Sequence, residues 1–271
     1  MTGRHPSGLN VTRRKDFAYL ASLKEKRELV LKSRDAANLT HWGYVLSGEF
    51  PKGIKRELQR RARLQGQVKF LDAGAGLGQA LAAAETASKN VQAYGLSPST
   101  PKKIASVTKK LFGNAHFTLN PALANKCIVG HFEVTRVPDT FDVIQSFNAL
   151  QYAHNKALAL ENLLNSLKRG GVLIASSTDI RAPLLSTSDP QAEKFARLSD
   201  EVTEQLLGTL RAQGFRISVA TWHYYGDKVL RIRRGTKQAN LSEFYEHRLL
   251  NNFPARLRQK KPRQLRLPFN S

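Results

Sequence analysis

The residues best suited to chemistry lie in the stretch Val68–Leu81, VKFLDAGAGLGQAL, which combines one carboxylate with closely spaced glycines. Its first residues are apolar and predict a short buried strand that ends at Asp72. Three glycines follow at alternate positions, Gly74, Gly76 and Gly78. The alanine-rich residues 79–88 then predict a helix. Because glycine adopts positive φ and has no Cβ, backbone N–H groups of such a turn can approach a ligand closely. The stretch therefore predicts a strand–turn–helix unit that binds a nucleotide-containing cofactor.

The spacing of the acid and the glycines, D-x-G-x-G-x-G, resembles motif I of the class I S-adenosylmethionine-dependent methyltransferases. A dinucleotide-binding turn would instead place its third glycine one position later, with the acid about 20 residues further on. The resemblance implies that S-adenosylmethionine is the cofactor, that the turn passes under its methionine part, and that the acid helps to hold its amino end. The residues of this turn that the resemblance assigns to the cofactor are Asp72, Ala73, Gly74, Gly76 and Gly78. The alternative is a glycine-rich turn with no ligand.

Two further strand ends resemble the family but lack its acids. Residues 91–96 predict the second strand, and Ser97 stands where the family has an acid that accepts hydrogen bonds from both ribose hydroxyls. A serine can make one such contact but not the charged bidentate pair. Residues 127–133 predict the third strand, where the family often has an Asp near the adenine. Here Phe132 is expected to stack on the adenine and His131 to bond its edge; the alternative is a half-buried strand end.

The segment after the predicted fourth strand resembles the floor of the family's active site. Residues 137–144 match the approach to that strand, and residues 146–154, SFNALQYAH, follow it. The resemblance adds Ser146 and Asn148 to the expected cofactor site. Methyl transfer from a sulfonium needs mainly proximity and alignment, and a base only where the nucleophile must lose a proton. The candidate catalytic residues are Tyr152 and His154, with His131 and Glu133 as further candidates for the base.

The order of predicted elements indicates an α/β fold. Residues 167–174 resemble the family's Gly-Gly turn into the fifth strand, and residues 215–223 and 229–233 predict an antiparallel hairpin. The resemblance implies a Rossmann-like, seven-stranded, mostly parallel sheet with helices on both faces and an antiparallel C-terminal hairpin. The expected organisation is a basic N-terminal helical extension over residues 1–66, the methyltransferase domain over residues 67–234 and a basic tail over residues 235–271.

Positive charge dominates the composition. The chain of 271 residues has 43 Lys and Arg against 21 Asp and Glu, a formal net charge of +22. A field of this sign attracts polyanions. The predicted helix over residues 51–65 has six basic residues against Glu57 alone, and residues 255–266, ARLRQKKPRQLR, have no acid. We expect nucleic acid as the partner, RNA more than DNA, held by helix 52–63 and tail 255–266; the alternative is a generally basic, well-solvated protein.

The remaining composition narrows the class of protein. No apolar run approaches the ~20 residues needed to span a membrane, and the N-terminal residues lack the apolar segment of a secretory signal. A single cysteine, Cys127, excludes a disulfide framework within the chain and fits a reducing compartment. We therefore expect an intracellular, cytoplasmic protein with no membrane partner, a nuclear location being the alternative.

Three functions remain open from the sequence. The first is a methyltransferase that acts on RNA or another nucleic acid. The second is a methyltransferase of a protein or small molecule, in which the charge serves location only. The third is a catalytically degenerate protein that keeps the fold as an RNA-binding or scaffold module. The missing acids at Ser97 and His131 favour the third, whereas Asp72 and the three glycines oppose it.

Overall fold

The computed structural model describes the chain between residues 52 and 245, with gaps. The longest gaps are residues 107–125, 181–199 and 222–227, and the shorter ones are 77, 99, 101, 104–105, 134, 136, 138, 148, 151–152, 154 and 178–179. Three of the expected site residues, Asn148, Tyr152 and His154, lie outside the described residues. So does the basic tail over residues 255–266.

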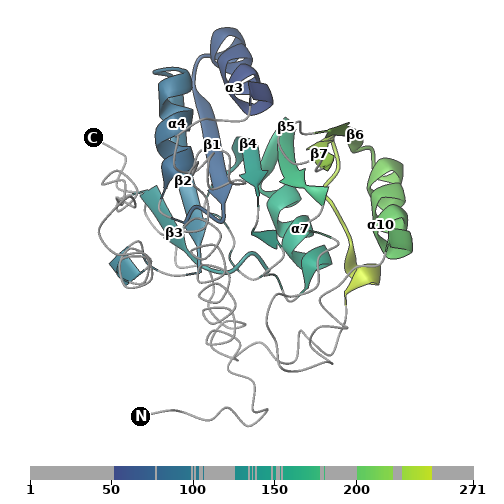
Figure 1. Cartoon of the computed structure of the whole chain (residues 1–271). Helices are drawn as coiled ribbons and strands as arrows, with labels where there is room; N and C mark the ends of the chain where they lie inside the picture. The colour runs from purple at the N-terminus through teal and green to yellow at the C-terminus, as the bar shows by residue number, and fades with distance from the viewer. Residues whose placement is uncertain are drawn as a thin grey trace, which may run out of the picture.

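One mixed sheet organises the described part of the chain (Figure 1). Its strands, in chain order, are β1 Val68–Ala73, β2 Val91–Ser97, β3 Cys127–Val129, β4 Phe141–Ser146, β5 Leu167–Ser176, β6 Arg216–Thr221 and β7 Lys228–Arg233. They lie in the order β3-β2-β1-β4-β5-β7-β6. The first five are parallel, whereas β7 is antiparallel to both β5 and β6. The seven-stranded, Rossmann-like sheet with its antiparallel C-terminal hairpin is confirmed.

Helices cover both faces of this sheet and create two apolar cores. Four α-helices are described, α3 Lys52–Gln65, α4 Gln79–Ala87, α7 Lys156–Asn165 and α10 Asp200–Ala212, with a short 3-10 helix, η3 Ser242–Phe244. Buried side chains of α7 and α10 pack in one core with Leu71, Ile144 and Leu173. Buried side chains of α3 and α4 pack in the other with Phe70 and Val143. Since neighbouring strand residues point to opposite faces, α3 and α4 lie on one face and α7 and α10 on the other.

The third and fifth strands differ from the sequence predictions. The third strand was expected over residues 127–133 but ends at Val129. The fifth begins at Leu167, so Gly170 and Gly171 lie within it rather than in a turn before it. A Cβ on Gly171 would lie 2.8 Å from the Lys168 carbonyl oxygen and 3.0 Å from that of Phe141. Glycine lets the backbone of β5 approach β4 where the register shifts between Phe141 and Val143.

Helix α10 ends close to a glycine. Residues 200–212 form α10, and Gly214 follows with φ of +89°. This left-handed conformation favours glycine just beyond a helix C-terminus.

Among the described residues, no helix combines the length and apolar character required to cross a membrane.

Candidate functional site

The candidate site lies at the carboxyl ends of β1, β2 and β4, on either side of Asp72. Asp72 is the register partner of Gly95 on β2 and of Gln145 on β4. The chain leaves β1 toward β2 and returns to β4 on its other side, so this edge is a topological switch point, where open parallel sheets bind ligands. The sequence identified Asp72, whereas the strand order brings Gln145 beside it.

The glycine turn between β1 and α4 has the backbone that its sequence predicts. Gly74, Gly76 and Gly78 have φ of +109°, +51° and +83°. The Gly74 and Ala75 N–H groups donate to the Leu96 carbonyl oxygen at 2.8 and 3.2 Å, which ties the turn to β2. Gly78 precedes α4 as its N-cap, without a side-chain cap. The turn therefore presents backbone at the start of a helix, which suits contact with a ligand.

Glycine is required at position 74 because of a close contact that the sequence does not reveal. A Cβ built on Gly74 would lie 2.3 Å from the Cβ of Ala149, which follows β4. It would also lie 3.9 Å from Cζ of Phe132, which follows β3. The turn after β1 is thus in close contact with the segment after β4 and lies near Phe132.

Asp72 is a buried carboxyl that accepts a hydrogen bond from a neighbouring side chain. Gln145 Nε2 donates to Asp72 Oδ1 at 2.9 Å. Burial raises the pKa of Asp72 to about 6, and the hydrogen bond from Gln145 opposes that rise. Within the described residues, Gln145 Oε1 is buried without a hydrogen-bond partner, which leaves an acceptor beside Asp72 for a ligand donor. In the sequence, Gln145 is a polar residue within the buried strand FDVIQS of β4, and this feature could have identified it.

Ser146 and Ala73 join the two strands on either side of the switch point. Ser146 Oγ donates to the Ala73 carbonyl oxygen at 3.1 Å, and Ser146 is fully buried. Both residues were expected to contact the cofactor. In the structure their side-chain and backbone groups hold β1 and β4 together beneath the glycine turn.

Ser97 and His131 are brought together at the ends of β2 and β3, where the sequence expected the ribose and the adenine. The Gly130 N–H donates to the Ser97 carbonyl oxygen at 2.8 Å. The His131 N–H donates to Thr135 Oγ1 at 2.8 Å, and the Thr135 N–H returns a bond to the His131 carbonyl oxygen at 2.9 Å. The loop after β3 is therefore closed on itself beside Ser97.

A second contact fixes this loop to the face of the sheet that α7 covers. Asn162 Nδ2 on α7 donates to the carbonyl oxygens of Phe132 and Glu133 at 3.0 and 2.6 Å. Phe132, His131 and Glu133 are all buried. Neither Thr135 nor Asn162 could be identified from the sequence, because both act through backbone groups of residues that no local pattern links to them.

Two kinds of chemistry find no support among the described residues. Burial raises the pKa of the Cys127 thiol to about 11, so the thiolate needed for nucleophilic attack is scarce at neutral pH. Within the described part of the chain, no group of three or more His, Cys, Asp or Glu side chains is arranged to hold a metal ion.

Comparison with known proteins places this site in a recognised domain. Residues 71–175 match the family model described as "Methyltransferase domain". This match begins on β1 and ends on β5, and so includes Asp72, the glycine turn and Gln145. A comparison with curated proteins found no match.

Three solved structures that match this chain are described as methyltransferases, and each has low sequence identity to it. The plantazolicin methyltransferase BpumL is 14% identical, with a TM-score of 0.48, over 83% of this chain and 98% of that one. A putative S-adenosylmethionine-dependent methyltransferase from Methanococcus maripaludis is 14% identical, with a TM-score of 0.48, over 82% and 95%. An O-methyltransferase family protein from Burkholderia thailandensis is 13% identical, with a TM-score of 0.45; the match covers 69% of this chain but only 57% of that one.

Proposed function

Because residues 71–175 are a methyltransferase domain of the class I S-adenosylmethionine-dependent family, we propose that the protein transfers a methyl group from S-adenosylmethionine to RNA or another nucleic acid. The observation that supports the transfer is the buried Asp72 beside a positive-φ glycine turn at the switch point of the sheet. The observation that supports the nucleic acid is the formal net charge of +22.

The residues at the switch point fit the cofactor. S-adenosylmethionine supplies an activated methyl group on a sulfonium, and its amino end is a cation that suits a carboxylate. Asp72 would hold the amino end, with Gln145 keeping the carboxyl in place. The backbone of Gly76 and Gly78 would lie against the methionine part. Phe132, next to Gly74, would pack on the adenine. Alignment of the bound groups is then the main contribution of the protein to the rate.

The pKa of Asp72 predicts how cofactor binding depends on pH. A carboxyl must be ionised to pair with a cationic amine, so affinity for S-adenosylmethionine should fall about tenfold per pH unit below the pKa of about 6. In Asp72→Asn the affinity should be weaker at pH 7 and should not fall between pH 7 and pH 5, because the titrating carboxyl is gone. Isothermal titration calorimetry between pH 5 and 8 measures both. A wild-type affinity that stays constant over this range would place the amino end elsewhere.

The raised pKa of Asp72 also predicts how stability depends on pH. Cofactor affinity should increase with pH, whereas the contribution of Asp72 to folding stability should decrease. Its pKa is raised from an ordinary 3.8 to about 6, so the folded protein binds the proton more tightly than the unfolded chain. The contribution of Asp72 to the free energy of unfolding therefore decreases as pH rises from about 4 to about 6. Urea unfolding should show Asp72→Asn to be more stable than the wild type at pH 8, with the difference shrinking below pH 4.

Because Ser97 stands where the family has an acid, we predict weak cofactor binding. A carboxylate at this position should increase the affinity. Ser97 lies buried at the end of β2, and an aspartate there could accept from both ribose hydroxyls. Ser97→Asp should lower the dissociation constant for S-adenosylmethionine about tenfold or more, since a hydrogen bond to a charged group contributes about 1.5–3 kcal/mol. Ser88→Asp, in the connection from α4 to β2, is the matched control and should leave it unchanged. If Ser97→Asp binds no more tightly, this position does not face the ribose.

A transfer assay tests the proposed function directly. The protein is incubated with S-adenosylmethionine labelled on its methyl group and with cellular RNA, DNA or protein as separate fractions. We expect label in RNA and none in the RNA incubated with Asp72→Ala. Label in the protein fraction alone would favour the protein substrate. Cofactor binding without any transfer would favour a degenerate module, which the serine at position 97 makes the second candidate.

The tail over residues 255–266 is proposed as one grip on the phosphates. Deleting residues 255–271 should flatten the slope of log affinity for RNA against log salt by roughly 0.7–0.9 for each phosphate that the tail neutralises. It should weaken binding to all sequences about equally, because phosphate contacts do not read bases. Affinity for S-adenosylmethionine should not change. An identical salt slope with and without these residues would show that they contact no phosphate.

The proposed location of this activity is the cytoplasm. A single cysteine, Cys127, in 271 residues suits a reducing compartment.

A further inference from the structure

A cluster of arginines lies on the sheet beside α3, where the sequence shows only scattered charges. On β7, Arg231 and Arg233 alternate with Leu230 and Ile232, which belong to the core under α7 and α10. The two arginines therefore point to the other face, the one that α3 covers. Arg216 on β6 is the register partner of Arg233 and shares that face.

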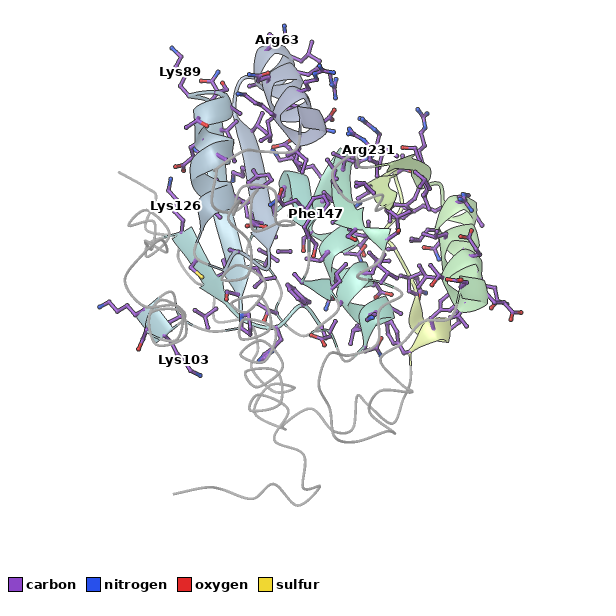
Figure 2. All side chains as sticks on the ribbon, viewed as in Figure 1. Arg63, Lys89, Lys103, Lys126, Phe147 and Arg231 are labelled. Atoms are coloured by element: carbon purple, nitrogen blue, oxygen red, sulfur yellow. The ribbon has the colours of Figure 1, made fainter. Side chains whose placement is uncertain are left out.

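One buried carboxylate from α3 lies within this cluster. Glu57 Oε1 accepts from Arg60 Nη2 and Arg61 Nε, each at 2.8 Å. Arg231 Nη2 lies 3.5 Å from Glu57 Oε2, and Arg233 Nη2 lies 3.5 Å from Glu57 Oε1. Figure 2 shows Arg231 between α3 and β7. Four guanidinium groups thus surround a single carboxylate, which leaves an excess of positive charge.

Of the four guanidiniums, that of Arg61 is buried and holds α3 to β5, whereas the other three remain partly exposed. Arg61 is buried, and its Nη2 donates to the Gly170 carbonyl oxygen of β5 at 2.6 Å. The sequence places Arg61 among the phosphate-binding residues of helix 52–63, but its burial gives it a structural role. The side chains of Arg60, Arg231 and Arg233 keep 44%, 28% and 39% of their surface exposed. These three and the exposed Arg216 form what we call the arginine face.

Glu57 does not neutralise this face. Burial lowers the pKa of Arg233, Glu57 raises it, and the positive charges of Arg61, Arg60 and Arg231 lower it again. The guanidiniums therefore repel one another, and the single carboxylate of Glu57 does not offset their four charges. On α3, the exposed Lys55, Arg56 and Arg63 add further positive charge nearby. Crowded, partly exposed guanidiniums of this kind bind phosphate oxygens well, because each fork can donate two hydrogen bonds.

We propose that the arginine face binds the phosphate backbone of the nucleic-acid substrate, an inference that rests on the proposed function. Its place in the sheet sets the size of that substrate. Arg231 is level with Ile174 of β5, which is level with Gln145 beside Asp72. Three strand spacings of about 4.8 Å therefore separate the Arg231 backbone from that of Asp72, roughly 14 Å. At about 3.4 Å of rise per nucleotide in a stacked strand, a stacked strand that reaches both has about four nucleotides.

The test replaces arginines of this face and compares the effect on RNA affinity with that of replacing basic residues elsewhere. The variants are Arg231→Ala with Arg233→Ala, which also contact Glu57, and Arg216→Ala alone, which leaves the contacts of Glu57 intact. The matched control is Arg211→Ala with Lys237→Ala, two exposed basic residues at the end of α10 and after β7. The probe is an RNA of about 20 nucleotides, longer than typical single-strand sites. Its affinity is measured by fluorescence anisotropy at several salt concentrations.

The expected results follow from counterion release. The slope of log affinity against log salt should flatten by roughly 1.4–1.8 in the double variant and 0.7–0.9 in Arg216→Ala. The control should change the slope by less than about 0.4, half the value for one phosphate, and calorimetry should find S-adenosylmethionine binding unchanged in all variants. An RNA of two nucleotides should bind weakly to every variant.

Other outcomes would overturn the inference. An equal decrease of slope in the control would show that only overall charge matters, and an unchanged slope in both test variants would show that RNA avoids this face. The protein could also bind phosphatidylserine vesicles preferentially. If that binding depended on these arginines and RNA binding did not, the arginine face would be assigned to a membrane surface. A wild-type protein that methylates another substrate and binds no RNA would instead refute the nucleic-acid part of the proposed function.

Discussion

Replacing Gly74 by valine is expected to weaken the binding of S-adenosylmethionine strongly. The new Cβ would lie 2.3 Å from the Cβ of Ala149, in a backbone conformation with φ of +109° that side chains rarely adopt. Overpacking of this kind typically costs about 1–3 kcal/mol, and the strained backbone adds roughly 1–3 kcal/mol. The turn after β1 and the segment after β4 must then separate, and both belong to the proposed cofactor site. Calorimetry should show affinity reduced by about two orders of magnitude or more.

Gly66→Ala is the matched control for this change. Gly66 also has a positive φ of +75°, but a Cβ there meets nothing within 4 Å. The control should therefore lose about 1 kcal/mol of stability from backbone strain and keep its cofactor affinity. Circular dichroism distinguishes a folded Gly74→Val protein from an unfolded one. A folded variant with wild-type affinity would show that the cofactor does not bind at the glycine turn.

The strand–turn–helix unit could be predicted from the sequence because all of its determinants are local. The apolar run before Asp72, the alternating glycines and the alanine-rich helix occupy one stretch of chain. The antiparallel hairpin followed from alternation in two neighbouring segments for the same reason. The third strand was predicted too long because the loop after Val129 is held by Thr135 and Asn162, through bonds to backbone groups. The local sequence after Val129 does not indicate such bonds.

The contacts that complete the site depend on register between distant strands. Gln145 meets Asp72 only because β4 pairs with β1, 73 residues away. The clash that makes Gly74 necessary likewise involves Ala149, which no local pattern connects to it. Arg61 belongs to the helix over residues 52–63 that was expected to contact phosphates, because six basic residues there face a single acid. Its partners Glu57 and the Gly170 carbonyl oxygen place it inside.

Glu57→Ala is expected to cause a large loss of stability. Burial raises the pKa of Glu57, but the hydrogen bonds and charges of Arg60 and Arg61 lower it more, to about 2. Removing the carboxylate leaves the buried Arg61 without its ionic partner and four guanidiniums repelling one another. Breaking a buried pair in this way costs about 3–5 kcal/mol. At roughly 2–4 °C per kcal/mol for a chain of this size, the melting temperature should fall by about 6–20 °C.

The dependence of this loss on pH identifies its cause. The pKa of Glu57 is lowered from an ordinary 4.5, so its contribution to stability is complete above about pH 4.5 and disappears as pH falls toward 2. The wild type and Glu57→Ala should therefore converge in acid. Glu85→Ala is the control, because Glu85 pairs with Lys126 at the surface and such pairs contribute about 0–1 kcal/mol. A difference between wild type and Glu57→Ala that persists at pH 2 would mean that Glu57 stabilises α3 by packing and not by its charge.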